Sequence, residues 1–560
     1  MASIGKHCKN CSADFEVTEE DIKFYDKVSP VFDSRKFQVP VPTLCPDCRQ
    51  QRRLVFRNER KLYHRKCDFS GKEIIAMYAP DVPYKVYDQD VWWSDKWDPL
   101  QYGRDFDFSK TFSEQLRALY LDVPHISLYT NNVENSYYTN FVINQKNCYL
   151  IFGGGSNEDC MFGNFISFSN TCLDLMSVFN CELCYEGGVS SNCYNCKFFL
   201  YVRNCSDCIM IEDCQSCKNC IGCFGLRNKE YCVFNESVGK EQFEAIKKEY
   251  EYLTDEKIKV LSTKLTELKK KVPHIGSHIY NSEDCTGDMI INCKRCEYSF
   301  SVRDCENCKY ASYSPKSISS YDCTFNSPDG VQFCYNVCST VGTRNSMATF
   351  LIWYCDEIFY STECHNSSNL FGCVGLKSQK YCILNKQYSQ EEYGKMAAKI
   401  AAHMMKTGEW GDYFPYEISP YSYNETIANE HFPLDRQQAG EIGMSWKKDD
   451  EKGKYQGAAV IVSSDIRNVT DDITRQILTC RQCGKNYKII QQELNFYRKM
   501  KIPVPKNCFD CRYKNRLALE NPHKLWDRTC MKCGAAIKTA YSPERPEVVY
   551  CESCYLKEVY

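Results

Sequence analysis

The sequence predicts a mainly β protein in which two cysteine-rich β-solenoid blocks with helical caps are flanked at both ends by small cysteine-rich domains. Two observations carry this prediction. The 560-residue chain contains 39 cysteines in three groups, and those of the middle group recur with a 12-residue period. The two outer groups are built from C-x2-C pairs instead. The same residue type therefore has two different physical uses in one chain.

Composition excludes several classes of protein. Hydrophobic residues make up 43% of the chain and aromatic residues 14%, which is enough for large cores and excludes global disorder. A net charge of −2 restricts any nucleic-acid contact to a local patch. The sequence has no apolar run of about 18 residues, so no membrane span is predicted. It has no apolar segment near the N-terminus, so no secretory signal is predicted either. We therefore expect a cytoplasmic protein whose cysteines are metal ligands or thiols.

Residues 1–60 are predicted to form an N-terminal metal-binding ribbon. Cys8 and Cys11 make one C-x2-C pair, and Cys45 and Cys48 make another. Each pair places two thiolates about one tetrahedral edge apart, and two pairs complete a Zn(Cys)4 site. In so short a segment, zinc replaces the core that the chain cannot build.

Residues 61–125 are predicted to be a degenerate second ribbon with an acidic aromatic extension. The segment from 45 to 91 aligns without a gap with the segment from 508 to 554. Opposite the four C-terminal cysteines of that alignment stand Cys67, Ser70, Asp88 and Val91. These four groups do not make a structural zinc site. We expect this lobe to fold around apolar side chains instead, namely Ile74, Tyr78, Val86, Trp92 and Trp93.

Residues 126–238 are predicted to form the first solenoid block. Eight cysteines follow one another at intervals of 12, from Cys148 to Cys232, and four of the coils carry a second cysteine three residues earlier. Turn residues such as Asn192 recur at a constant phase. A short fixed period of this kind is typical of a β-solenoid, in which equivalent residues stack in ladders. One coil could correspond to one 12-residue period or to two; we favour two periods, because a single one leaves little interior.

Three interpretations remain open for the solenoid cysteines. We favour inward-facing free thiols, because cysteine is small and apolar. Zinc ions or iron–sulfur clusters bridging neighbouring coils are the second interpretation. Disulfides are the third, although a reducing compartment disfavours them.

A second solenoid block is predicted at 278–388, with a helical cap or linker before it at 239–277 and a helical cap after it at 389–406. The end of the first block, from Cys223 to Asn235, recurs from Cys373 to Asn385. In the later cap, Ser389 and Glu392 have the spacing of a capping box. We expect both helical segments to cover the solenoid ends, which otherwise expose unpaired strand edges.

The C-terminal part is predicted to contain an aromatic and charged linker at 407–475, a zinc ribbon at 476–520 and another at 521–560. The aromatic stretch 410–433 is too apolar for a free linker, so we expect it to pack along the solenoid. Two further sets of four cysteines complete a total of three structural zinc sites: Cys480, Cys483, Cys508 and Cys511, then Cys530, Cys533, Cys551 and Cys554.

The ribbons at 8–54 and 480–517 share the elements F-Y, then V-P, then C-x2-C-R. This pattern resembles a probable zinc-ribbon domain of treble-clef type found in many bacterial proteins. The wider layout, with stretches such as 91–95 and 419–426, resembles uncharacterised multi-ribbon proteins of candidate-phyla (Patescibacteria-type) bacteria. The resemblance implies zinc binding and no activity.

Two hypotheses of function follow from the sequence. The first is a nucleic-acid or ribosome-associated scaffold, because planar guanidinium groups beside aromatic rings suit phosphate contact and base stacking. Its candidate RNA- or DNA-binding residues are Arg49, Arg52, Arg53, Arg57, Arg512 and Arg516. The second is a protein-interaction or assembly module with purely structural zinc, in which solenoid faces or the acidic aromatic stretch 88–108 contact a protein partner.

A thiol-based metal-storage or redox protein is a third hypothesis, which rests on the number of cysteines. We expect no enzyme, since no Ser-His-Asp set, phosphate-binding loop or dinucleotide fingerprint is visible. The oligomeric state is not predicted.

Overall fold

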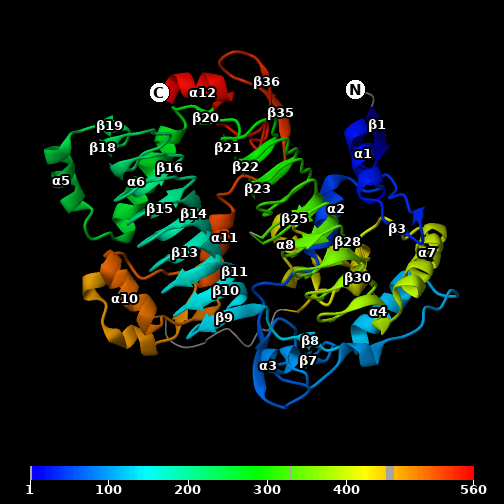
Figure 1. Cartoon of the computed structure of the whole chain (residues 1–560). Helices are drawn as coiled ribbons and strands as arrows, with labels where there is room; N and C mark the ends of the chain where they lie inside the picture. The colour runs from blue at the N-terminus through cyan, green and yellow to red at the C-terminus, as the bar shows by residue number, and fades with distance from the viewer. Residues whose placement is uncertain (1–2, 328, 449–459, 560) are drawn as a thin grey trace. The chain divides into compact units, whose positions relative to one another are not determined.

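The chain folds into two compact units, each built from segments far apart in the sequence. The computed structural model describes residues 3–327, 329–448 and 460–559. Unit 1 consists of Met1–Leu128, Ser277–Lys447 and His523–Leu525, and unit 2 of Tyr129–Gly276, Lys448–Pro522 and Trp526–Tyr560 (Figure 1). Unit 1 therefore joins the N-terminal lobes to the second solenoid block, whereas unit 2 joins the C-terminal lobes to the first block.

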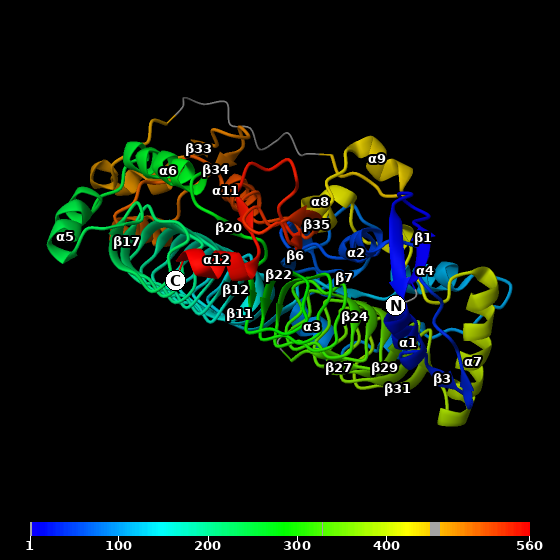
Figure 2. The same ribbon diagram turned by 90° about the horizontal axis from the view of Figure 1, so that it is seen from above.

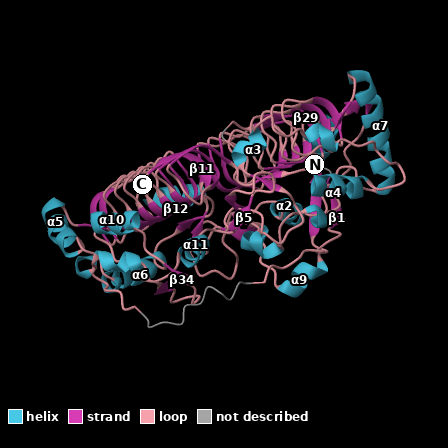
Figure 3. Ribbon diagram, turned by 90° about the horizontal axis from the view of Figure 1, so that it is seen from below, coloured by secondary structure: helices cyan, strands magenta, loops and turns pink. Residues whose placement is uncertain are grey.

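The solenoid of unit 2 confirms the predicted β-solenoid and corrects its coil length. Its strands run parallel in sequence order, and Asn140 pairs with Phe152 one period on, as Lys197 does with Ile209. One coil therefore corresponds to one 12-residue period, and the expectation of two periods was wrong. The strands are β9 (Thr130–Glu134), β10 (Asn140–Lys146), β11 (Tyr149–Glu158), β12 (Met161–Ser167), β13 (Leu173–Phe179), β14 (Tyr185–Ser191), β15 (Lys197–Leu200), β16 (Ile209–Glu212), β17 (Lys218–Ile221) and β18 (Glu230–Val233), stacked as in Figure 3.

Each coil turns at four corners, because every third residue has left-handed backbone. In the coil 180–191 these residues are Asn180, Leu183, Glu186 and Val189, with φ between 47° and 54°. Asn tolerates this conformation better than most residues, which explains its constant phase in the repeat. The corner amides also bond from coil to coil, since the Asn180 amide donates to Asn192 at 2.8 Å.

The residue after each corner faces the interior of the solenoid, so one coil has only four inward positions. In the same coil these are Cys181, Cys184, Gly187 and Ser190, all buried. The Cys184 thiol donates to the carbonyl of Glu182 at 3.3 Å, and the Ser190 hydroxyl donates to that of Gly188 at 2.6 Å. The interior is narrow, as expected for so short a coil, and cysteine fills it because its side chain is small and can donate this bond. The inward orientation of the cysteines is confirmed.

Helices close and flank the solenoid of unit 2. The chain leaves β18 through an antiparallel strand, β19 (Glu236–Ser237), and α5 (Lys240–Glu249) packs on β18. The next helix, α6 (Asp255–Lys269), lies along the side of the coils near β16 instead (Figure 2). The cap expected at 239–277 is thus two helices, of which the first covers the end. The strand β20 (His274–Ile275) follows.

The C-terminal lobes belong to unit 2. Their elements are the 3-10 helices η5 (Ile466–Asn468) and η6 (Asp471–Arg475), the strands β33 (Leu478–Thr479), β34 (Asn486–Tyr487), β35 (Trp526–Thr529), β36 (Ala536–Thr539) and β37 (Val549–Tyr550), and the helices α10 (Gln491–Met500), α11 (Phe509–Leu517) and α12 (Glu552–Val559). Apolar side chains of α6 and α10, including Leu261 and Leu494, share one core with outward residues of the coils such as Leu173.

The solenoid of unit 1 repeats the same design with two irregularities. Most of its coils again follow the period, but Ile279 pairs with Ile290, one position short of a period, and Ile318 pairs with Gln332, two positions beyond one. The strands are β21 (Ile279–Tyr280), β22 (Gly287–Ile291), β23 (Ser299–Arg303), β24 (Tyr321–Thr324), β25 (Val331–Gln332), β26 (Tyr335–Cys338), β27 (Thr343–Arg344), β28 (Met347–Phe350), β29 (Asp356–Phe359), β30 (Ser368–Phe371), β31 (Lys380–Ile383) and the antiparallel β32 (Lys386–Gln387).

The second cap and the start of the aromatic stretch pack on the solenoid of unit 1, as predicted. The helix α7 (Gln390–Thr407) begins with the expected capping box between Ser389 and Glu392 and packs on β31. Beyond it, the Trp410 ring stacks on Phe371 of the solenoid. Short helices follow: η2 (Tyr416–Ile418), η3 (Tyr423–Glu425), α8 (Ala428–His431) and α9 (Arg436–Glu441). Within the linker predicted at 407–475, residues 449–459 lie outside the described residues.

The N-terminal lobes complete unit 1. Their elements are β1 (Ser3–His7), β2 (Asp14–Thr18), α1 (Glu19–Lys27), β3 (Val31–Phe32), β4 (Arg35–Lys36), α2 (Pro46–Leu54), β5 (Tyr63–Lys66), β6 (Glu73–Ala76), β7 (Val86–Tyr87), α3 (Gln89–Trp93), η1 (Pro99–Tyr102), α4 (Phe112–Asp122) and β8 (His125–Ile126). Among the helices of the described residues, none combines the length and the apolar character needed to cross a membrane.

Candidate metal centres and their docking contacts

Three groups of four cysteines could each hold one metal ion. Within each group the four sulfur atoms all lie within 4.8 Å of one another. The groups are Cys8, Cys11, Cys45 and Cys48; Cys480, Cys483, Cys508 and Cys511; and Cys530, Cys533, Cys551 and Cys554. The fold thus brings together the twelve cysteines in the sets that their spacing indicated.

Each group joins a hairpin to the start of a helix. In the first, Cys8 and Cys11 lie in the turn between β1 and β2, and Cys45 is the N-cap residue of α2. In the second, Cys508 is the N-cap residue of α11. A helix N-terminus carries partial positive charge and therefore favours a thiolate.

Backbone amides favour the thiolate form of one cysteine in the second group and one in the third. Burial alone would raise the pKa of Cys480, but the backbone amides of Cys483 and Cys508 lower it to about 6. The pKa of Cys530 is lowered to about 6 in the same way, against its burial, by the amides of Cys551 and Cys533. Burial raises the pKa of another ligand, Cys508, to about 11. Four converging cysteine sulfurs fit a divalent, thiophilic cation, which would favour the thiolate form of all four.

The degenerate lobe keeps the hairpin without the ligand set. The Cys67 sulfur still accepts bonds from the backbone amides of Ser70 at 3.4 Å and Asp88 at 3.2 Å. The expected apolar core is present at four of the five positions, which are Ile74, Tyr78, Val86 and Trp92. The fifth, Trp93, is 40% exposed.

The arginines of α2 dock the first ribbon on the solenoid of unit 1. The Arg49 Nε donates to both carboxylate oxygens of Asp322 at 3.0 Å, and Arg53 Nη1 donates to one of them at 2.9 Å. Arg53 also donates to the side-chain oxygen of Asn336, which stands at the same corner as Asp322 in the following coil. All three charged side chains are at most 5% exposed. The ion pair is therefore part of the core between helix and coil.

The arginines of α11 dock the ribbon at 476–520, which holds the second cysteine group, on the solenoid of unit 2. Arg512 and Arg516 contact the carboxylate of Asp174 at 2.9 and 3.2 Å, and the Asp174 side chain is fully buried. Arg516 also pairs with Glu186 at 3.0 Å, in the coil that follows Asp174. Asp174 and Asp322 are both corner residues, with φ of 59° and 55°. We call each of these corner aspartates, with the arginine pair that it binds, a docking pair.

The arginines proposed from the sequence to bind RNA or DNA make contacts inside the two units instead of forming an exposed surface. Arg57 is also buried and bonds to Glu59 and Ser339, while Arg52 is half-buried and donates to the carbonyl of Phe414. All six candidate nucleic-acid-binding arginines thus have partners within their own unit. Sequence reasoning read the arginines correctly as a repeated feature but did not identify the aspartates that bind them.

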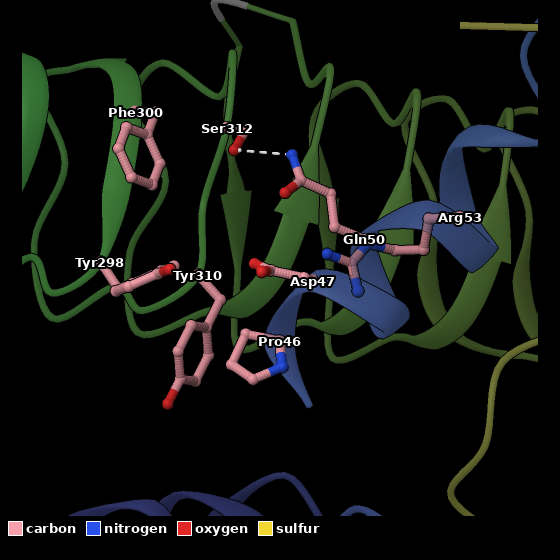
Figure 4. A pocket seen from close by; sticks show the side chains of 8 residues that line it. All are labelled: Pro46, Asp47, Gln50, Arg53, Tyr298, Phe300, Tyr310 and Ser312. Atoms are coloured by element: carbon pink, nitrogen blue, oxygen red, sulfur yellow. Dashed lines mark hydrogen bonds between the residues drawn. The ribbon is translucent and has the colours of Figure 1, made fainter. Parts of the chain in front are cut away.

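A small hollow lies beside the docking pair of unit 1. It is lined by Pro46, Asp47, Gln50 and Arg53 of the α2 segment and by Tyr298, Phe300, Tyr310 and Ser312 of the solenoid (Figure 4). The Gln50 amide spans it and donates to the Ser312 hydroxyl at 3.1 Å. In unit 2, the larger Phe509 and Tyr513 replace Pro46 and Gln50, and the Phe509 ring stacks on Phe162.

A strand pairing holds the second lobe of each unit, which is the lobe at 61–125 in unit 1 and the lobe at 521–560 in unit 2. The strand β7 pairs with β8 in unit 1, and β37 pairs with β20 in unit 2. The strands β8 and β20 lie in the two copies of a V-P-H-I sequence, at 123–126 and 272–275. This repeat was the signal in the sequence that could have revealed the contact, and sequence reasoning missed it.

Comparisons with known proteins give no family for the chain. No protein-family model matches the sequence, and no curated protein matches it either. The metal centres and docking pairs are therefore assigned from their own residues and geometry.

Proposed function

We propose that the protein is a non-enzymatic scaffold in which three structural zinc ions hold small lobes against a β-solenoid. The docking pairs support this role most directly. In unit 1, Arg49 directly follows the ligand Cys48, and Arg53 lies about one turn further along the same helix face. A metal that fixes the start of α2 thereby fixes the position of both guanidinium groups relative to Asp322.

The energetics of the docking pairs couple metal binding to the solenoid. Desolvating an arginine or a carboxylate is costly, and only a well-placed partner offsets this cost. If the ribbon unfolds, Asp322 loses both arginines at a site where its side chain is 0% exposed. We therefore propose that zinc stabilises the solenoid face as well as the ribbon that binds it.

The ligand sets favour zinc and a structural role. Each site offers four thiolates, which is the composition of a closed tetrahedral zinc site with no position left for a substrate. A treble-clef type of ribbon, with one knuckle in a hairpin and the other at a helix start, agrees with the observed elements. The His125 and Glu363 side chains form a fully buried pair against Tyr120, so this pair is not accessible to a substrate.

A protein partner is the second element of the proposal. The solenoid of unit 2 carries exposed aromatic side chains, among them Phe168 at 53% and Tyr194 at 46% exposure. Flat solenoid faces with such side chains suit a protein surface. An RNA or DNA partner has less support, because five of the six arginines that suggested it are buried and the sixth, Arg52, is half-buried.

The deciding experiment is the metal content of the full chain. The protein is purified with reductant and without added metal, and its elements are measured by mass spectrometry. We expect about three zinc ions per chain and no iron, since three groups could hold a metal. A clearly higher content, or stoichiometric iron, would favour metal storage or electron transfer by the solenoid thiols. Co-purification of a defined protein that persists after nuclease treatment would support the protein partner.

A further inference from the structure

The three tetra-cysteine groups differ in how far solvent reaches them. In the first and second groups one of four cysteines is exposed, Cys11 and Cys483 respectively. In the third group Cys533 is exposed, and Cys551 and Cys554 are half-buried. Oxidation of a thiolate requires access by the oxidant. The third group is therefore the most open of the three to a dissolved oxidant.

The third group also lies at the start of the C-terminal helix, α12. Cys551 directly precedes α12 and Cys554 lies in its first turn. The next residue, Tyr555, is fully buried, and its hydroxyl donates to Asp213 at 2.8 Å and accepts from Arg227 at 3.0 Å. Asp213 and Arg227 form a buried ion pair at the solenoid wall. Figure 2 shows α12 lying along the coils of unit 2.

The N-terminal copy of this lobe docks without a metal. In the alignment of the two lobes, Trp92 takes the place of Tyr555 and is also fully buried. Its indole N–H donates to the carbonyl of Pro124 at 3.0 Å, and the Lys377 ammonium lies 5.2 Å from the centre of its ring. Aromatic packing thus holds the lobe in unit 1 in place, whereas four cysteines are available to do so in unit 2. The lobe of unit 1 is therefore a metal-free control for the lobe of unit 2.

We propose that the third group is an oxidation site: a peroxide joins Cys533 to Cys551 as a disulfide, zinc leaves, and α12 is released from the solenoid. The two sulfur atoms lie 3.8 Å apart. The Cys533 thiolate attacks the peroxide, expels hydroxide and becomes a sulfenic acid. The Cys551 thiolate then attacks this sulfur and expels a second hydroxide. The two thiolates lose two electrons in total, and the peroxide is reduced to two hydroxide ions.

Release of α12 follows from the loss of two ligands. Two remaining thiolates hold zinc weakly compared with four. A disulfide between Cys533 and Cys551 also pulls the start of α12 toward the β35–β36 hairpin, on which Cys533 lies. The contacts of Tyr555 depend on the orientation of that first turn. The inference rests on the proposed zinc sites, so the zinc content is measured before any peroxide is added.

The test treats the zinc-loaded full chain with hydrogen peroxide and follows three readouts. A chromogenic chelator measures zinc release, mass spectrometry after alkylation identifies the oxidised cysteines, and hydrogen exchange compares segments 549–559 and 86–93. We expect the first zinc equivalent to leave roughly tenfold faster than the other two, because its ligands are more accessible. Exchange should increase in 549–559 and stay unchanged in 86–93.

Several results would overturn the inference. Release of all three equivalents at one rate would do so, as would first oxidation at Cys11 or Cys483, or continued protection of 549–559 after zinc has left. Two variants sharpen the comparison. C533S should lose the fast phase, whereas the matched change C483S, at the exposed ligand of the second group, should keep it. A zinc content below three ions per unmodified chain, measured before peroxide is added, would contradict the proposed function and not this inference.

Discussion

Replacing Asp322 with asparagine tests whether the docking pair holds unit 1 together. The carboxylate is 0% exposed and accepts from both Arg49 and Arg53. Asparagine has the same shape and tolerates the left-handed corner, where φ is 55°. The substitution therefore removes the charge and leaves the backbone and the volume unchanged.

The expected cost follows from the burial of the two arginines. Breaking a buried ion pair by removing one partner costs about 3–5 kcal/mol, because the remaining charge stays uncompensated. The amide oxygen of asparagine can still accept one hydrogen bond, so we expect a loss near the lower end, about 3 kcal/mol. With a urea m value of about 3 kcal/mol/M, this loss shifts the unfolding midpoint by roughly 1 M.

Tryptophan fluorescence reports the unfolding of unit 1 almost alone. Six of the seven tryptophans belong to this unit, and only Trp526 belongs to unit 2. The matched control is D304N, at an exposed corner aspartate with φ of 54° whose side chain accepts only from Asn292 among the bonds seen there. We expect the control to change stability by less than about 0.5 kcal/mol. A D322N effect below about 1 kcal/mol, or equal to that of the control, would refute the role given to the docking pair.

Three further outcomes are expected. D174N in unit 2 should cost less than D322N, because Arg516 keeps Glu186 as a partner; equal losses in urea unfolding would contradict this. Burial raises the pKa of Glu493 from 4.5 to about 7, so its protonated form stabilises the fold fully below about pH 4.5, and this stability is lost as pH rises through 7. When the pH falls from 8 to 6, the free energy of unfolding of unit 2 should rise by about 1.4 kcal/mol, and E493Q should abolish this rise. Hydrogen exchange of α10 measures the change; if E493Q showed the same pH dependence as the unmodified chain, the role given to Glu493 would be contradicted. C196S should change stability by less than about 1 kcal/mol, because Ser320 makes the same inward bond in the other solenoid; a loss above about 2 kcal/mol in urea unfolding would show that thiol packing matters more than the bond.

The solenoid and the ligand sets were accessible from sequence because both are local. Each coil repeats the environment of the coil before it, so the inward positions favour small side chains. The spacing of the cysteines from Cys148 to Cys232 therefore equals the period of the coils. In the same way, a C-x2-C pair encodes its own knuckle geometry. The coil length was misjudged because the sequence does not display the corners. Four left-handed residues per coil let a single period close into a ring, and they include bulky residues such as Leu183 as well as Asn180.

The sequence by itself determined the repeat, the cysteine groups and the capping helices, since each depends on residues close together in the chain. Tertiary structure decided which ribbon binds which solenoid block: Arg49 meets Asp322, and Arg512 meets Asp174, across several hundred residues in each case. It also decided that these arginines are buried rather than exposed. The physical reason is that a charged side chain looks the same in sequence whether water or a distant carboxylate compensates it. Only the fold brings the carboxylate to it.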